Sequence, residues 1–250
     1  MSVKVGSGIR LIREKLIVSG DILEVYQYSG GYYEGFKSEG GRNKVATGEQ
    51  KRINRTQTIY RARNTIRRII NANIGQYGRE FTAKFVTLTF KNHITDLKMA
   101  HCMFDKYTKR LNYRVYGSKR ALLQYTAVPE FTKRGRVHYH VIYYNLPYLK
   151  ASDLESLWGN GFVKINKIDH VDNVGAYICK YMAKDADDSR FHGNKLYFNS
   201  RGLFKPEEIT DKKVVESVRD SLPVDKLRYS NTFENEHLGT VIYEQYNLTE

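Results

Sequence analysis

Apolar and polar side chains alternate strictly along residues 85–90, a pattern with the period of two that marks a β-strand. One face of this strand carries Val86, Leu88 and Phe90, and the other carries Phe85, Thr87 and Thr89. A strand with one strongly apolar face belongs in a sheet with a core on that side, so the pattern predicts a central strand.

Two further strands are predicted near residues 121–131 and 137–146, joined by the basic turn Thr132-Lys133-Arg134-Gly135. The spacing predicts a β-hairpin with a positively charged tip. A shorter strand is expected over residues 161–169.

Apolar residues recur every three to four positions over residues 55–74 and again over 95–115, which predicts two amphipathic helices. A short helix ending at Trp158 and another over about 172–184 complete the order β-α-β-β-α-β-α for this region. The predicted fold class is therefore α+β, with an antiparallel sheet flanked by helices. We expect an N-terminal strand and turn arm over 1–54, a catalytic domain over 55–185 and a C-terminal extension over 186–250.

The chain has 250 residues, of which 41 are Lys or Arg and 27 are Asp or Glu, giving a formal charge of +14. This excess favours a polyanionic partner, and no run approaches the ~18 apolar residues of a membrane span, so nucleic acid is expected and a membrane is not. The two cysteines, Cys102 and Cys179, are far apart and form no CxxC pair, which fits a reducing cytoplasm.

His138 and His140 flank Tyr139 in the second hairpin strand, so their imidazoles project to the same face and can share a cation. Imidazoles alone hold Mg²⁺ or Mn²⁺ poorly, and a carboxylate is expected to complete such a site. The candidate is Glu130, eight positions before His138 on the preceding strand, and Asp169 and Asp172 are the alternatives.

The last predicted helix places phenols and ammonium groups in one stripe, because positions i, i+3, i+4 and i+7 share a helix face. These residues are Tyr177, Lys180, Tyr181 and Lys184. A separate apolar stripe of Val174, Ile178 and Met182 gives the helix another face to bury, and Tyr177 lies further from it than Tyr181. Tyr177 is therefore the expected nucleophile, with Lys180 beside it to pair with a phosphate.

Basic side chains gather on two of these elements and are the candidates for phosphate contacts. They are Arg61, Arg63, Arg67 and Arg68 on the first helix, and Lys133, Arg134 and Arg136 at the hairpin tip.

Taken in order, the strand 85–90, the His-Tyr-His pair and the segment Val174 to Lys184 resemble the three motifs of rolling-circle replication initiators of the HUH endonuclease superfamily. The two tyrosines four residues apart resemble the form found in initiators of isometric single-stranded DNA phages and some bacterial plasmids. The resemblance implies a ferredoxin- or RRM-like core and a third polar metal ligand at the position of Glu130. It also implies metal-dependent nicking of one DNA strand through a 5′-phosphotyrosine link and later rejoining.

Two alternatives remain open: a single-strand transposase or conjugative relaxase, and a noncatalytic DNA-binding module. Relaxases generally carry a three-histidine cluster, which the residues around His138 lack. The partners expected are single-stranded and origin DNA, and also a host helicase and polymerase, because the chain contains no phosphate-binding loop of the type G-x-x-x-x-G-K-[ST].

Overall fold

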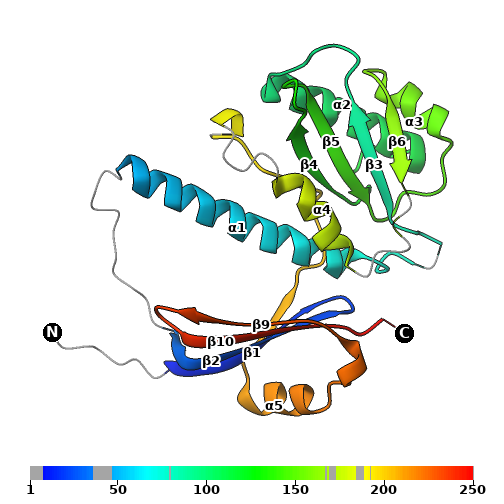
Figure 1. Ribbon diagram of the computed structural model, residues 1–250. Coiled ribbons are helices and arrows are strands. Elements are labelled where there is room, and N and C mark those ends of the chain that lie inside the picture. The colour runs from blue at the N-terminus through cyan, green and yellow to red at the C-terminus, as the bar shows by residue number, and fades with distance from the viewer. Residues whose placement is uncertain are drawn as a thin grey trace. The chain divides into compact units, whose positions relative to one another are not determined.

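The computed structural model describes residues 8–35, 47–78, 80–166, 168, 173–183, 189–191 and 193–249. The chain divides into two compact units, each built around a five-stranded antiparallel sheet (Figure 1). The central unit is Gly48–Lys205, and the terminal unit combines Met1–Thr47 with Pro206–Glu250. The predicted α+β class is confirmed, and both units belong to it.

The sheet of the central unit has the strand order β6-β3-β5-β4-β7. Its strands are β3 (Lys84–Thr89), β4 (Tyr125–Phe131), β5 (Val137–Tyr143), β6 (Val163–Asn166) and β7 (Phe198–Asn199). Strands β4 and β5 form the predicted hairpin, and β3 pairs with β5 on its other edge. The His-Tyr-His strand therefore lies in the middle of the sheet.

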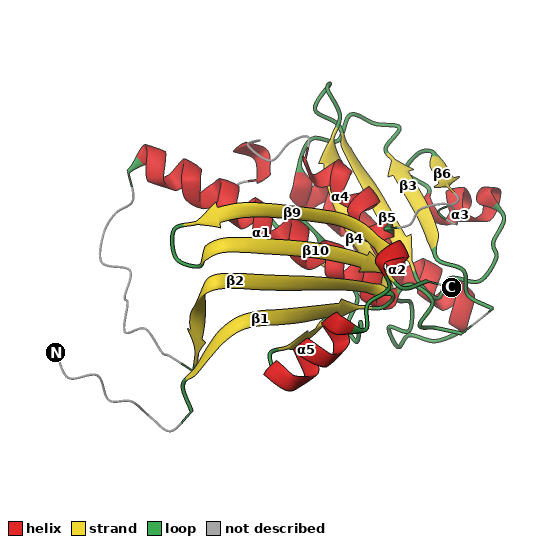
Figure 2. Ribbon diagram, turned by 60° about the horizontal axis from the view of Figure 1, so that its bottom comes forward, coloured by secondary structure: helices red, strands yellow, loops and turns green. Residues whose placement is uncertain are grey.

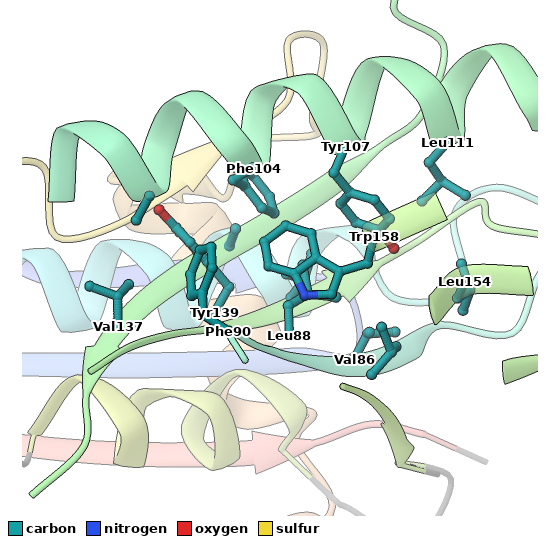
Figure 3. Packing of buried hydrophobic residues seen from close by; sticks show 14 of the residues in the cluster. Val86, Leu88, Phe90, Phe104, Tyr107, Leu111, Val137, Tyr139, Leu154 and Trp158 are labelled. Carbon is teal, nitrogen blue, oxygen red and sulfur yellow. The ribbon is translucent and has the colours of Figure 1, made fainter. Parts of the chain in front are cut away.

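One face of this sheet is covered by α2 (Leu97–Tyr116) and α3 (Ala151–Trp158). The Asp96 side chain accepts hydrogen bonds from the first backbone N–H groups of α2, and Gly117 ends the helix with a φ of 61°. Figure 3 shows the Trp158 indole packed between α2 and the sheet, where it is fully buried and donates to the carbonyl of Thr89 at 2.7 Å. Val86, Leu88 and Phe90 face this core, as their alternation predicted.

The opposite face is covered by α1 (Gly48–Asn73) and α4 (Val174–Ala183), which lie side by side in Figure 1. Ile66 and Ile70 of α1 and Ile178 of α4 pack against Phe85 and Ile142 of the sheet. Helix α1 begins earlier than the predicted residue 55. Its first turns carry no apolar stripe, so the periodicity could not reveal them.

The terminal unit joins the two ends of the chain in a second sheet with the order β8-β1-β2-β10-β9. Its elements are β1 (Arg10–Ser19), β2 (Ile22–Glu34), β8 (Glu207–Ile209), α5 (Lys212–Asp220), β9 (Leu227–Asn235) and β10 (Gly239–Asn247). Figure 2 shows the four long strands lying next to one another, with α5 against one face. The arm 1–54 and the extension 186–250, described separately from sequence, thus share one sheet.

Short 3₁₀ helices occur at Ser189–Phe191 in the central unit and at Val224–Lys226 in the terminal unit. Among the helices of the described residues, none has both the length and the apolar character needed to cross a membrane.

Candidate active site

The candidate site lies on the sheet face that α1 and α4 cover, because β5 directs its even-numbered residues there. In the antiparallel register His138 lies opposite Glu130 on β4 and opposite Thr89 on β3. His140 lies opposite Val128 and Thr87. Both histidines and Glu130 thus share one face, while Tyr139 between them is buried in the core on the other.

His140 is held in place by contacts on several sides. Its Nε2 lies 2.6 Å from Oε2 of Glu130, and its Nδ1 lies 3.3 Å from the hydroxyl oxygen of Thr87. Its ring stacks on Phe85 with the centroids 5.7 Å apart. When Nε2 carries the proton and donates it to the carboxylate, Nδ1 accepts from Thr87, so the two contacts select one tautomer and one ring orientation.

His138 is half-buried on the same strand. Burial is the main reason that its pKa is lowered from the usual value of 6.5, and the neighbouring His140 and Arg136 add to this effect, whereas the Glu130 carboxylate opposes it. At neutral pH the imidazole is therefore uncharged and keeps a lone pair for an electrophile.

Two imidazoles and one carboxylate in adjacent register are a donor set that fits a divalent cation such as Mn²⁺ or Mg²⁺. The convergence of Glu130 with His140 supports this fit, because it brings an oxygen and a nitrogen donor together at the surface of the sheet. Within the part of the chain that the structure describes, no three His, Cys, Asp or Glu side chains are already arranged as a metal site. The alternative ligands Asp169 and Asp172 lie outside the described residues.

Tyr177 reaches this face from α4. Its ring meets Phe85 edge-on with the centroids 5.9 Å apart, so Phe85 contacts both Tyr177 and His140. The Lys180 ammonium lies 5.5 Å from the centroid of the Tyr177 ring, as expected for neighbours one helical turn apart. Tyr177 is half-buried rather than fully exposed. Tyr181 belongs to α4, but its side chain and Lys184 are outside the described residues.

The basic candidates differ in their surroundings. Lys133 and Arg134 at the hairpin tip are exposed, whereas Arg136 is half-buried and donates to the carbonyl of Phe90 at 2.8 Å. On α1, Arg61 is exposed. Arg63, Arg67 and Arg68 are half-buried, and Arg63 and Arg67 act electrostatically on Cys179 of α4. Arg61, Lys133 and Arg134 are therefore the most accessible of the set.

Phe85 and Thr87 were not singled out from sequence as site residues. Their signal was present in the alternation of residues 85–90, which placed both on the face away from the Leu88 core. Only the pairing of β3 with β5 shows that this face is the one that carries His140.

Residues 83–186 match a family model whose description is that of a replication-associated protein of the ORF2 type. The matched segment contains β3, the β4–β5 hairpin and α4, and so includes every element of the candidate site. The comparisons with curated proteins and with solved structures gave no match. The family match supports a replication initiator and, with it, an interaction with DNA.

Proposed function

We propose that this protein initiates rolling-circle DNA replication by nicking one strand at an origin and linking itself to the new 5′ end. The observation that carries the proposal is the contact of Phe85 with both Tyr177 and His140. It places a phenol beside a histidine and carboxylate pair on one sheet face. A tyrosine next to this donor set suits transfer of a phosphoryl group to a protein oxygen.

In the proposed reaction the Tyr177 oxygen attacks the phosphorus of the scissile phosphodiester. The new bond joins that oxygen to phosphorus, the bond from phosphorus to the 3′ oxygen breaks, and a proton passes from the phenol to the departing 3′-hydroxyl in the overall balance. No water is consumed, so a later attack by a 3′-hydroxyl reverses the link and rejoins the strand. Tyr181 would provide the second nucleophile for successive transfers.

Each side chain of the site has a distinct part in this reaction. A divalent cation held by His138, His140 and Glu130 would neutralise charge on the scissile phosphate. Lys180, which lies against the Tyr177 ring, would pair with the phosphate or stabilise the phenolate, and Lys184 would do the same for Tyr181. Thr87 and Phe85 hold the His140 ring in position. The exposed basic residues of α1 and the hairpin tip would bind the DNA backbone, which gives affinity without sequence preference. A host helicase and polymerase would supply strand separation and synthesis.

A pool of random-sequence single-stranded oligonucleotides tests the proposal without knowledge of the origin. Protein incubated with the pool and Mn²⁺ or Mg²⁺ is expected to give a covalent adduct that survives denaturing electrophoresis, and sequencing the attached DNA identifies the preferred site. The adduct should be absent in metal-free buffer and in Tyr177→Phe. DNA binding with no adduct under any condition would identify a noncatalytic binding module instead.

A further inference from the structure

Helix α4 approaches α1 more closely than any side chain would allow at the point of contact. A Cβ added at Gly175 would overlap the carbonyl oxygen of Arg67 and would lie 2.7 Å from the Oδ1 of Asn71. Because the first of these atoms is backbone, α1 could accommodate a larger residue only by moving away. Gly175 therefore fixes the separation of the two helices two residues before Tyr177.

Asn71 of α1 forms hydrogen bonds with the first turn of α4. It is 6% exposed, its Oδ1 accepts from the backbone N–H of Gly175 at 2.9 Å, and its Nδ2 donates to Oδ1 of Asn173 at 3.0 Å. The Asn173 oxygen also accepts from the N–H of Ala176 at 2.8 Å. The first N–H groups of a helix have no partner within it, so a residue of α1 supplies part of the N-terminal cap of α4.

A second contact follows one turn along α4. The Cys179 thiol lies 3.2 Å from the carbonyl oxygen of Arg63 and donates to it. Burial raises the pKa of this thiol to about 11, so it stays protonated at neutral pH and keeps its role as a donor. The contacts at Gly175 and Cys179 lie on either side of Tyr177 along the helix, and together they oppose both sliding and rotation of α4.

We propose that Asn71 is a positioning residue that sets the register of α4 on α1 and so directs Tyr177 toward Phe85 and His140. This inference rests on the proposed function of Tyr177 as the nucleophile. Successive residues of a helix point about 100° apart, so even a small rotation of α4 would turn the phenol away from the sheet face. Asn71 itself would not contact DNA or metal.

Asn73 is a matched control on the same helix. It is fully buried, and its side chain hydrogen-bonds to the backbone of Ile69 and Phe204 and to the Tyr77 hydroxyl. None of these partners belongs to α4. Truncation of either asparagine removes buried hydrogen bonds, but only Asn71→Ala removes a contact to the helix of the nucleophile.

The test compares wild type, Asn71→Ala, Asn73→Ala and Tyr177→Phe on an oligonucleotide that the wild type links covalently, at saturating DNA and Mn²⁺. Asn71→Ala is expected to slow adduct formation about 10- to 100-fold while the DNA Kd and the midpoint of the Mn²⁺ titration stay unchanged. Asn73→Ala is expected to lower the melting temperature and keep the wild-type rate at a temperature where both variants are folded. Gly175→Ala, which alters the same contact from the α4 side, is expected to slow the reaction as Asn71→Ala does.

Adduct formation by Asn71→Ala at the wild-type rate would overturn the inference and leave the proposed function intact. Equal slowing of both asparagine variants at equal folded fraction would also overturn it, because the effect would then reflect general weakening of the core. If Tyr177→Phe still formed the adduct, the proposed nucleophile would be wrong, and the inference about its positioning would fail with it.

Discussion

The two units of this protein share an architecture but differ in charge. The central unit carries 29 Lys and Arg against 12 Asp and Glu, a net charge of +17, whereas the terminal unit carries 12 against 15, a net charge of −3. The whole positive charge of the chain therefore lies in the unit that holds the candidate site. Attraction of a polyanion is expected there and not in the terminal unit.

Their aromatic residues also differ in their partners. On the sheet face of the terminal unit away from α5, Tyr26 lies opposite Tyr243 with the ring centroids 4.9 Å apart, and Tyr229 lies 5.9 Å from Tyr243. The Tyr243 hydroxyl donates to the buried Glu24 at 2.8 Å. These tyrosines contact one another across strands and stabilise the sheet, whereas Tyr177 of the central unit contacts a residue that also contacts His140. A tyrosine therefore has to be assigned a role from its neighbours.

The largest expected effect is that of Tyr177→Phe, which removes the nucleophilic oxygen and almost no volume. The first covalent adduct should fall to background, while Tyr181→Phe should still form it and fail only at a second strand transfer. Peptide mapping of the linked tyrosine by mass spectrometry, with a rejoining assay on both variants, measures this. An adduct that maps only to Tyr181 would contradict the assignment. Tyr243→Phe in the terminal unit is the matched control and should nick normally.

Changes in the histidine and carboxylate set should come next in size. His138→Ala is expected to reduce nicking more than about 100-fold, because residues that merely support metal ligands already cost 10- to 100-fold when changed. For the more buried His140, His140→Gln is preferable to alanine, because it keeps a donor for the Glu130 carboxylate. Metal titrations of nicking and a DNA Kd for each variant separate lost chemistry from lost binding.

Glu130→Gln should have a graded effect, since both imidazoles remain. The metal concentration needed for half-maximal nicking should rise about 10- to 100-fold, with the DNA Kd unchanged. An identical metal titration would show that another residue supplies the oxygen ligand. Full activity of His138→Ala or His140→Gln in metal-free buffer would remove the metal hypothesis altogether.

The charge difference predicts a smaller effect on binding alone. Replacement of the exposed hairpin-tip pair Lys133 and Arg134 with alanine should weaken single-stranded DNA binding. It should also lower the slope of log K against log salt by about 1.4, because each single-strand phosphate contact contributes about 0.7. The exposed pair Lys212 and Lys213 of α5 is the matched control from the terminal unit, with the same change in net charge. Equal effects of the two double variants would mean that DNA contacts both units.

The smallest expected effect concerns the stability of the central unit. Burial lowers the pKa of His101 on α2 from 6.5, against a smaller opposing effect of Asp96, and its Nδ1 hydrogen-bonds with the Tyr139 hydroxyl. Below pH 6.5 the unfolded chain then binds a proton that the folded chain does not, so the free energy of unfolding should fall as the pH is lowered. His101→Gln keeps a polar group without titrating and should show a shallower decline in denaturant titrations. Its nicking should stay at the wild-type level, because His101 lies on the sheet face away from the site.

Local patterns predicted much of the central unit. The alternation of residues 85–90 assigned both faces of β3 correctly, and the hairpin, α2 and α4 lie where periodicity and turn residues placed them. His138 and His140 were placed on one face by the strand period alone. These features depend on neighbours within a few residues, which is the range over which sequence periodicity is informative.

Contacts between distant segments were not predictable in this way. The terminal sheet pairs β2 with β10, more than 200 residues later, and no local pattern indicates such a partner. Asn71 and Asn73 would both be judged poor residues for a helix interior, and their sequence gives no reason to distinguish them. Only the packing of α4 on α1 shows that one of them caps the tyrosine helix and the other does not.

The sequence by itself thus determined the chemical groups, their strand and helix faces, and the positive charge of the chain. The tertiary structure alone decided that Phe85 contacts both Tyr177 and His140, that Glu130 meets His140, and that the charge is confined to one unit. The physical reason is that the period of an element fixes which way a side chain points, whereas its partner depends on how whole elements pack to bury their apolar faces.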